Sequence, residues 1–176
     1  MKNKGGGIKK NTSRGIVLGI DPGTTRIGIG IIEKNGGVLL VKYAALLASE
    51  EELRKDEGVR LLCIERALKK ILKKYTPDIV GVERLFFSNN QKTAFAVAHA
   101  RGVILKTIAE TKTTLVELTP NQIKLAVAGS GNASKEAVSK MVGIALHIET
   151  KKMLDDITDA LAIAIAAPFF VSPNNR

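Results

Sequence analysis

The sequence is poor in the residues that mark several common classes of protein. It has one cysteine, Cys63, no tryptophan and only 4% aromatic residues. A single cysteine excludes an intrachain disulfide and a cysteine-based metal cluster. The longest apolar stretch, residues 160–171, contains Pro168 and is too short to span a bilayer. The first residues hold no apolar core of a signal peptide, so the default expectation is a cytoplasmic location without membrane attachment.

The chain also has few acidic residues relative to its basic ones. Its 27 lysines and arginines against 17 aspartates and glutamates give a formal net charge of +10 and a pI of about 9.8. Residues 1–14 hold basic residues but no acid, are rich in glycine and show no periodicity, so we expect a flexible basic arm there. The charge favours nucleic acid or an anionic membrane surface as partner, although a solubilising surface bias is the simplest explanation.

The pattern of apolar residues predicts a single α/β domain over residues 15–170 and a short tail at 171–176. Strands are expected at 16–21, 26–33, 38–44, 79–83 and 114–118, the first three forming an antiparallel meander. Helices are expected at 50–74, 90–110, 134–148 and 155–167, and a capping box starts a further helix at Thr119-Pro120. Helical crossovers allow the first, fourth and fifth strands to pair in parallel, which predicts a mixed five-stranded sheet with helices on both faces.

Four carboxylates, distant in the sequence, stand where such a fold could gather them. Asp21 and Glu83 each end an apolar strand. Asp156 and Asp159 lie three apart at the start of an apolar helix and therefore share a face. Carboxylate oxygens suit Mg²⁺, and two such ions can orient an attacking water and stabilise the leaving oxygen of a phosphodiester. On a basic chain, this arrangement indicates metal-dependent cleavage of a polyanion.

Each carboxylate also has a purely structural explanation. Asp21 could bond to its own Pro-Gly turn, Glu83 could be a strand-end surface residue, and Asp159 could be a solvated helix position. Asp155 and Asp156 suit a helix start without any metal, because they face the positive end of the helix dipole. We expect Asp155 to cap the helix, while its offset of four from Asp159 keeps it open as a ligand.

The segment Ile-Asp-Pro-Gly-Thr-Thr at 20–25 raises a rival interpretation. It resembles the first phosphate loop of the sugar-kinase, actin and chaperone ATPases, in which an acid helps to place magnesium and the Gly-Thr-Thr backbone binds phosphate. Those proteins have two lobes and further glycine-rich segments. This chain is too short for two such lobes, so the sequence does not favour ATPase activity.

Longer stretches resemble the bacterial RuvC family of Holliday-junction resolvases. They are Leu-Gly-Ile-Asp-Pro-Gly-Thr-Thr-Arg-Ile-Gly at 18–28, Val-Glu-Arg-Leu-Phe-Phe-Ser-Asn-Asn-Gln-Lys-Thr-Ala at 82–94 with Ala-Arg-Gly-Val at 100–103, Thr-Pro-Asn-Gln-Ile-Lys-Leu-Ala-Val-Ala-Gly at 119–129 with Asn-Ala-Ser-Lys at 132–135, and Asp-Ile-Thr-Asp-Ala-Leu-Ala-Ile-Ala at 156–164. The likeness runs over about residues 16–167 in the family's order and spacing, which is more specific than any one motif.

The resemblance implies an RNase H-like fold and a homodimer that nicks two strands of like polarity in a four-way DNA junction. The family's metal ligands would fall on Asp21, Glu83, Asp156 and Asp159, holding Mg²⁺, two ions per site, with Mn²⁺ as a substitute. Its DNA-contacting residues would fall on Phe86, Lys124 and Lys135. RuvA and RuvB are candidate branch-migration partners, and the basic arm is outside the family pattern.

General chemistry bears on the DNA contacts as well. Phe86 and Phe87 follow Glu83 closely, and one ring could stack on an unpaired base, although both could equally belong to the core. Lys124 lies in the capped helix and Lys135 beside a helix N-terminus, places that suit phosphate contacts. The sequence thus predicts a magnesium-dependent crossover junction endodeoxyribonuclease of DNA recombination and repair, leaving 5′-phosphate and 3′-hydroxyl ends. The alternatives are an RNase H-like nuclease acting on RNA or simple duplex, and a non-catalytic junction-binding protein.

Overall fold

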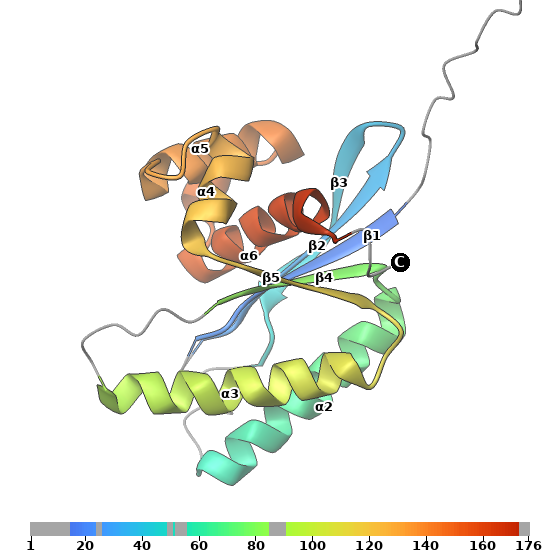
Figure 1. Cartoon of the computed structure of the whole chain (residues 1–176), viewed down its shortest axis with the longest axis vertical. Helices are drawn as coiled ribbons and strands as arrows, with labels where there is room; N and C mark the ends of the chain where they lie inside the picture. The colour runs from blue at the N-terminus through green and yellow to red at the C-terminus, as the bar shows by residue number, and fades with distance from the viewer. Residues whose placement is uncertain (1–14, 24–25, 49–50, 52–55, 85–90, 173–176) are drawn as a thin grey trace, which may run out of the picture.

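A five-stranded mixed sheet forms the centre of the protein (Figure 1). The structure, a computed structural model, describes residues 15–23, 26–48, 51, 56–84 and 91–172, so the arm predicted at 1–14 and Phe86 lie outside the described residues. The strands are β1 (Gly15–Asp21), β2 (Gly28–Asn35), β3 (Val38–Leu46), β4 (Ile79–Glu83) and β5 (Thr114–Leu118), in the sheet order β3-β2-β1-β4-β5. Strands β1, β2 and β3 pair antiparallel, whereas β4 is parallel to β1 and to β5. The predicted sheet is therefore confirmed.

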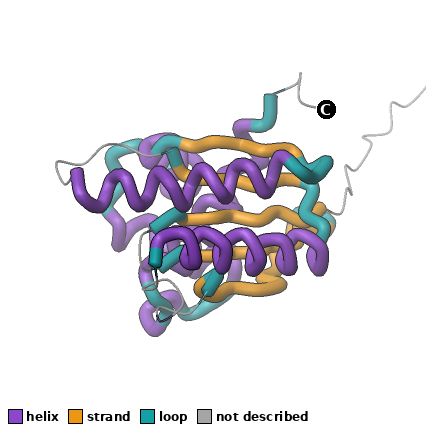
Figure 2. The backbone as a smooth tube through the Cα atoms, turned by 90° about the horizontal axis from the view of Figure 1, so that it is seen from below, coloured by secondary structure: helices purple, strands orange, loops and turns teal. Residues whose placement is uncertain are grey.

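Helices cover both faces of this sheet. On one face lie α2 (Glu57–Tyr75) and α3 (Gln91–Ala109), which pack side by side across the strands (Figure 2). On the other face lie α4 (Pro120–Ala128), α5 (Lys135–Leu146) and α6 (Asp155–Ala166), with short 3-10 helices η1 (Thr150–Lys152) and η2 (Ala167–Phe170) at either end of α6 (Figure 1). Within the described ranges, no helix has both the length and the apolar character needed to cross a bilayer.

The start of α2 differs from the expectation. The sequence predicts a helix from residue 50, but α2 begins at Glu57, because the side chain of Asp56 accepts a hydrogen bond from the backbone N–H of Gly58 and caps the helix there. By contrast, the capping box predicted for α4 is present in full. The hydroxyl of Thr119 accepts from the N–H of Gln122, and the side chain of Gln122 accepts from the N–H of Thr119.

Alternating residues of the strands build two separate apolar cores. Leu18 and Ile20 of β1 pack with the buried residues of α2 and α3, whereas Val17 packs with those of α4, α5 and α6. Successive side chains of a strand point to opposite faces, so residues 17, 19 and 21 of β1 all face α6. This alternation places the side chain of Asp21 on the α6 side of the sheet.

Glycines let α6 lie directly on the sheet. A Cβ added to Gly19 would stand 2.0 Å from the carbonyl oxygen of Ala160, and one on Gly28 would stand 1.8 Å from that of Asp156. A Cβ on Gly30 would stand 2.8 Å from the backbone nitrogen of Leu161, and one on Gly81 would stand 2.8 Å from side-chain atoms of Ile163 and Ala167. We call Gly19, Gly28, Gly30 and Gly81 the glycine seam. No larger residue fits along this seam without moving α6 away from the strands.

Candidate active site

The register of β1 and β4 brings two of the predicted carboxylates together. Gly19 pairs with Gly81 and Ile20 with Val82, so Asp21 and Glu83 are the next residues of these parallel neighbours. Both side chains share the strand face that α6 covers. The protonated carboxyl group of Asp21 donates a hydrogen bond to Glu83. Two residues sixty-two positions apart in the sequence thus have interacting carboxyl groups at the carboxyl edge of the sheet.

The first turn of α6 adds the other two carboxylates. Because Gly28 lets the helix backbone at Asp156 approach the sheet, the N-terminal end of α6 lies beside the end of β1. The negative charges of Asp156 and Asp159 both act on Asp21. The four carboxylates predicted from the sequence therefore lie in one neighbourhood.

Burial and mutual repulsion hold part of this acidic cluster in its protonated form. Burial, followed by the charges of Glu83, Asp159 and Asp156, raises the pKa of Asp21 from 3.8 to about 7. The pKa of Glu83 is raised mainly by burial and then by Asp159, although the hydrogen bond from Asp21 opposes the rise. Burial also raises the pKa of Asp159. Carboxyl groups so perturbed are typical of functional sites.

Cationic side chains balance part of the remaining charge. The Lys135 ammonium lies 3.1 Å from a carboxylate oxygen of Asp155 and 3.2 Å from one of Asp159. Burial works to lower the pKa of Lys135, but its hydrogen bonds to these two carboxylates outweigh it and raise that pKa. Arg26 stands 4.0 Å from Asp156. The sequence did not reveal these ion pairs, although Arg26 and Lys135 both lie within the stretches that resemble the RuvC family.

Asp155 does not cap α6 as expected. Leu154 occupies the cap position, and no side chain there accepts a hydrogen bond from the free N–H groups. The carboxylate of Asp155 is instead engaged by Lys135, which reaches it from the start of α5. Asp155 therefore helps to hold α5 and α6 together.

Lys124 also comes to the acidic cluster. A hollow of about 250 Å³ is lined by Glu83, Lys124, Lys135 and Asp159. The structure thus brings both predicted DNA-contacting lysines beside the carboxylates, with the apolar wall supplied by residues of α4, α5 and α6. An anionic ligand entering this hollow would meet two ammonium groups next to the acidic residues.

Arg101 supports the strand end that carries Glu83, a role that sequence reasoning missed. Its Nε donates a hydrogen bond to the backbone oxygen of Glu83 at 3.3 Å, and its guanidinium forms an ion pair with Glu117 of β5. Arg101 lies in α3, on the other face of the sheet from α6. The Ala-Arg-Gly-Val stretch, which resembles the RuvC family, was the one sequence feature that singled out this arginine, but it does not indicate which group the arginine contacts.

The donor set fits a hard divalent cation in kind. Among the residues that the structure describes, no three Asp, Glu, His or Cys side chains are drawn together closely enough to enclose a metal ion as they stand. However, the site offers only carboxylate oxygens, which Mg²⁺ prefers. Burial raises the pKa of Asp21 most, and the charges of Glu83, Asp159 and Asp156 raise it further although Lys135 opposes them. The chemistry of these donors therefore suits a hard divalent cation.

Comparison with known proteins agrees with this geometry. The profile of the family described as crossover junction endodeoxyribonuclease RuvC matches residues 17–167. The RuvC protein of Moorella thermoacetica is 40% identical over 164 residues, covering 92% of this chain and 95% of that protein. That of Carboxydothermus hydrogenoformans is 42% identical over 150 residues, covering 85% and 93%.

Solved structures lead to the same family. RuvC of T. thermophilus in complex with Holliday junction substrate has a TM-score of 0.79 at 30% identity, covering 88% of this chain and 93% of that one. The yeast mitochondrial Holliday junction resolvase Ydc2, with a TM-score of 0.63 at 16% identity, shares the fold. The chain belongs to the RuvC family of crossover junction endodeoxyribonucleases.

Proposed function

We propose that this chain resolves four-way DNA junctions by cutting two strands of like polarity. The observation that carries the proposal is the convergence of Asp21, Glu83, Asp156 and Asp159 at one sheet edge of a RuvC fold. The relative from T. thermophilus was solved with a Holliday junction as its substrate, which supports the same substrate here. The net charge of +10 agrees with a polyanionic partner.

The RuvC family is one of metal-dependent nucleases, and the finer assignment of the metal is part of the proposal. Asp21, Glu83, Asp156 and Asp159 would hold two Mg²⁺ ions, with Mn²⁺ as a substitute. When bound, such ions lower the pKa of a coordinated water and neutralise charge on the phosphate. Asp21, on the central strand, would serve both ions, and Glu83 would hold one ion or orient the water. Water attacks the phosphorus in line, the bond to the 3′ oxygen breaks, and 5′-phosphate and 3′-hydroxyl ends result.

The lysines beside the carboxylates would receive the DNA strand. Lys124 and Lys135 line the hollow next to Glu83 and Asp159, where their ammonium groups can contact the phosphates on either side of the cut. Lys135 pairs with Asp159, and if Asp159 held a metal ion instead, this ammonium would be free to contact the DNA. Phe86, which lies outside the described residues, completes the proposal as a ring that stacks on a base unpaired at the crossover.

Paired cuts need two copies of the active site. We therefore propose a homodimer whose protomers each cut one strand, in the cytoplasm, with RuvA and RuvB as candidate partners. Residues 15–170 would form the nuclease domain, flanked by the basic arm at 1–14 and the tail at 171–176.

The test compares Asp21→Asn and Glu83→Gln with the unaltered chain on a synthetic four-way junction. Both variants should lose Mg²⁺-dependent cleavage but still bind the junction at low salt, because each removes a negative charge and no DNA contact. Full activity in either variant would remove that residue from the mechanism. Equal cutting of linear duplex, or of RNA, would identify a different RNase H-like nuclease. Binding without any cleavage would identify a junction-binding protein.

A further inference from the structure

A second hollow lies away from the acidic cluster, between the edge strand β3 and α2. Its volume is about 500 Å³, and it is lined by Tyr43 of β3 and by Arg66, Lys70, Lys74 and Tyr75 of α2, with apolar residues between them. We call it the α2 groove. Among the described residues, three cationic side chains and no carboxylate line this groove, whereas the larger hollow beside α5 includes several acidic residues.

The cations of the α2 groove form a regular stripe. Arg66, Lys70 and Lys74 recur every four residues, so they lie on one side of α2, about 6 Å apart along its axis. All three are exposed, and within the described residues none of them forms an ion pair with a carboxylate. Unpaired cations in a row keep their full attraction for an anionic ligand.

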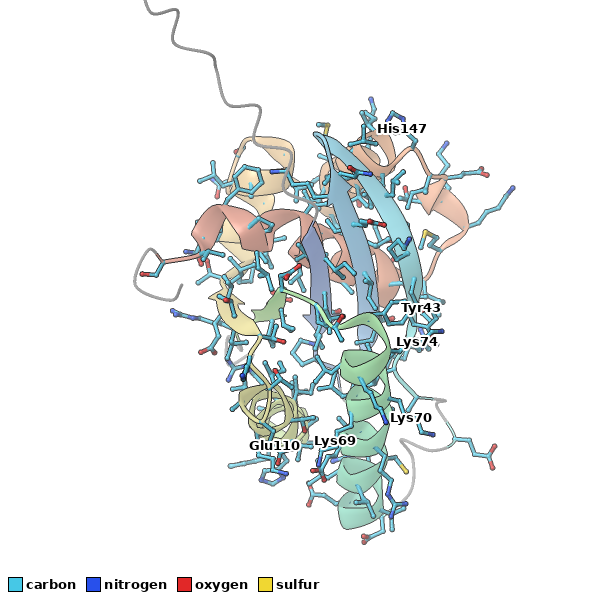
Figure 3. All side chains as sticks on the ribbon, turned by 90° about the vertical axis from the view of Figure 1, so that its right-hand side faces the viewer. Tyr43, Lys69, Lys70, Lys74, Glu110 and His147 are labelled. Atoms are coloured by element: carbon cyan, nitrogen blue, oxygen red, sulfur yellow. The ribbon has the colours of Figure 1, made fainter. Side chains whose placement is uncertain are left out.

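The neighbouring Lys69, outside the groove, differs from these three cations because it has acidic partners. Lys69 pairs with Glu65 at 2.7 Å and with Glu110 at 3.1 Å. Figure 3 shows Lys69 directed towards Glu110, while Lys70 and Lys74 lie on the side of α2 that faces Tyr43. Acidic residues therefore neutralise Lys69, whereas the three groove cations have no carboxylate partner among the described residues.

The two tyrosines of the chain, Tyr43 and Tyr75, meet in this groove. Their ring centres lie 5.7 Å apart, and the ammonium of Lys74 lies 4.9 Å from the centre of the Tyr75 ring. The ring holds this ammonium at the groove without neutralising its charge. Tyrosine hydroxyls beside basic side chains are common phosphate contacts in protein–DNA interfaces.

The groove starts at the sheet edge that carries the acidic cluster. In the register, Asp21 is level with Gly28, and Gly28 is level with Leu46 at the end of β3. Leu47, the next residue, lines the groove, which then follows α2 as far as Tyr75, at the opposite edge of the sheet. The acidic cluster lies on the α6 face of the sheet and the groove on the α2 face, so a polyanion that passes round this edge of the sheet can reach both.

We propose that the α2 groove binds the phosphodiester backbone of a junction arm, with Arg66, Lys70 and Lys74 contacting its phosphates. This rests on the proposed function, because it takes the substrate of the acidic cluster to be DNA. A nucleic acid fits better than an acidic protein segment, since the positive charges recur at a regular spacing along α2. The contacts carry no base information and add affinity for the arm, whatever its sequence.

The test measures binding of the full chain to a four-way junction, without divalent cations, over a range of salt concentrations. A groove variant carries Lys70→Gln and Lys74→Gln. Its control carries Lys69→Gln and Lys73→Gln, which removes the same charge from the same two turns of α2 outside the groove. The slope of log K against log salt should become shallower by about 2 in the groove variant, or about 1 per lost phosphate contact. It should stay unchanged in the control.

Cleavage separates this role from catalysis. At saturating protein, the single-turnover rate of the groove variant should equal that of the unaltered chain, because no groove residue reaches the acidic cluster. Equal slopes for the two variants would overturn the proposal and leave the groove to another anionic partner. If the unaltered chain binds linear duplex as well as junctions and cuts neither selectively, the proposed function fails. In that case, the salt dependence of binding to linear duplex, measured for the same two variants, still tests whether the groove contacts DNA.

Discussion

Replacing Asp21 with asparagine should make the protein more stable at pH 8 while abolishing its activity. In the absence of divalent cations, Asp21 is forced to ionise at this pH although burial and three neighbouring carboxylates favour its protonated form. Asparagine has the shape of the protonated side chain and can still donate a hydrogen bond to Glu83. The substitution therefore removes an electrostatic cost of the folded state and leaves the packing almost unchanged.

The expected size follows from the pKa of Asp21, which is about 7 in the folded protein against an ordinary value of 3.8. Below pH 4, both the folded and the unfolded chain hold this proton. Between pH 4 and pH 7 only the folded chain holds it, so the free energy of unfolding falls as the pH rises. A difference of roughly 3 pH units corresponds to about 4 kcal/mol above pH 7. In a chain of this length, this is a shift of about 8–16 °C in Tm.

Thermal unfolding with a chelator at pH 5 and pH 8 measures this effect. The gain of Asp21→Asn over the unaltered chain should be large at pH 8 and small at pH 5, and adding Mg²⁺ should stabilise only the unaltered chain strongly. Asp155→Asn is the matched control, because it removes the same charge from a side chain that is 77% exposed. An Asp21→Asn protein with equal or lower Tm at pH 8 would refute the reasoning.

Three further substitutions test how the site is assembled. Gly19→Ala should destabilise the protein by about 3 kcal/mol or more in urea unfolding and weaken cleavage, because its methyl group would overlap the α6 backbone. Gly102→Ala in α3 is the control, since a Cβ added there has no atom within 4 Å, and it should stabilise the protein by about 1 kcal/mol. Lys135→Gln should move the acidic limb of the cleavage pH profile to higher pH, since the Lys135 charge lowers the pKa values of the carboxyl groups around it. Lys135→Arg keeps the charge and should leave the profile as in the unaltered chain. An acidic limb that does not move in Lys135→Gln would contradict this account. Arg101→Gln should slow cleavage at saturating protein without weakening junction binding, because it removes the hydrogen bond that holds the backbone of Glu83. It should also lower the free energy of unfolding by about 1–2 kcal/mol. A loss of binding with an unchanged cleavage rate would argue against that positioning role.

Much of the sheet could be predicted because its signals are local. The expected strands 79–83 and 114–118 coincide with β4 and β5, since each is a short apolar run bounded by turn or helix-start residues. The start of α2 could not be fixed in the same way. Residues 50–56 are mostly charged and suit a helix as well as a loop, so only the hydrogen bond accepted by Asp56 marks the boundary.

The acidic cluster was predictable for a related reason. Ends of neighbouring strands meet at one edge of a sheet, so placing Asp21 and Glu83 at strand ends nearly placed them together. The cations around them were not predictable, because Lys135 and Arg26 reach their partners through packing between elements distant in the sequence. The α2 groove could not be predicted for the same reason, since Tyr43 and Lys70 become neighbours only when β3 and α2 pack together.

The glycine seam bears on how freely the rest of the chain can change. Where side chains separate a helix from a sheet, each exchange of one residue for another alters the gap. At Gly19, Gly28 and Gly30 the strand backbone instead lies directly against the backbone of α6, so contacts between main-chain atoms set the spacing between Asp21 and the first turn of α6. The apolar cores can therefore accept substitutions, in nature or in the laboratory, without changing the distance between Asp21 and the carboxylates of α6.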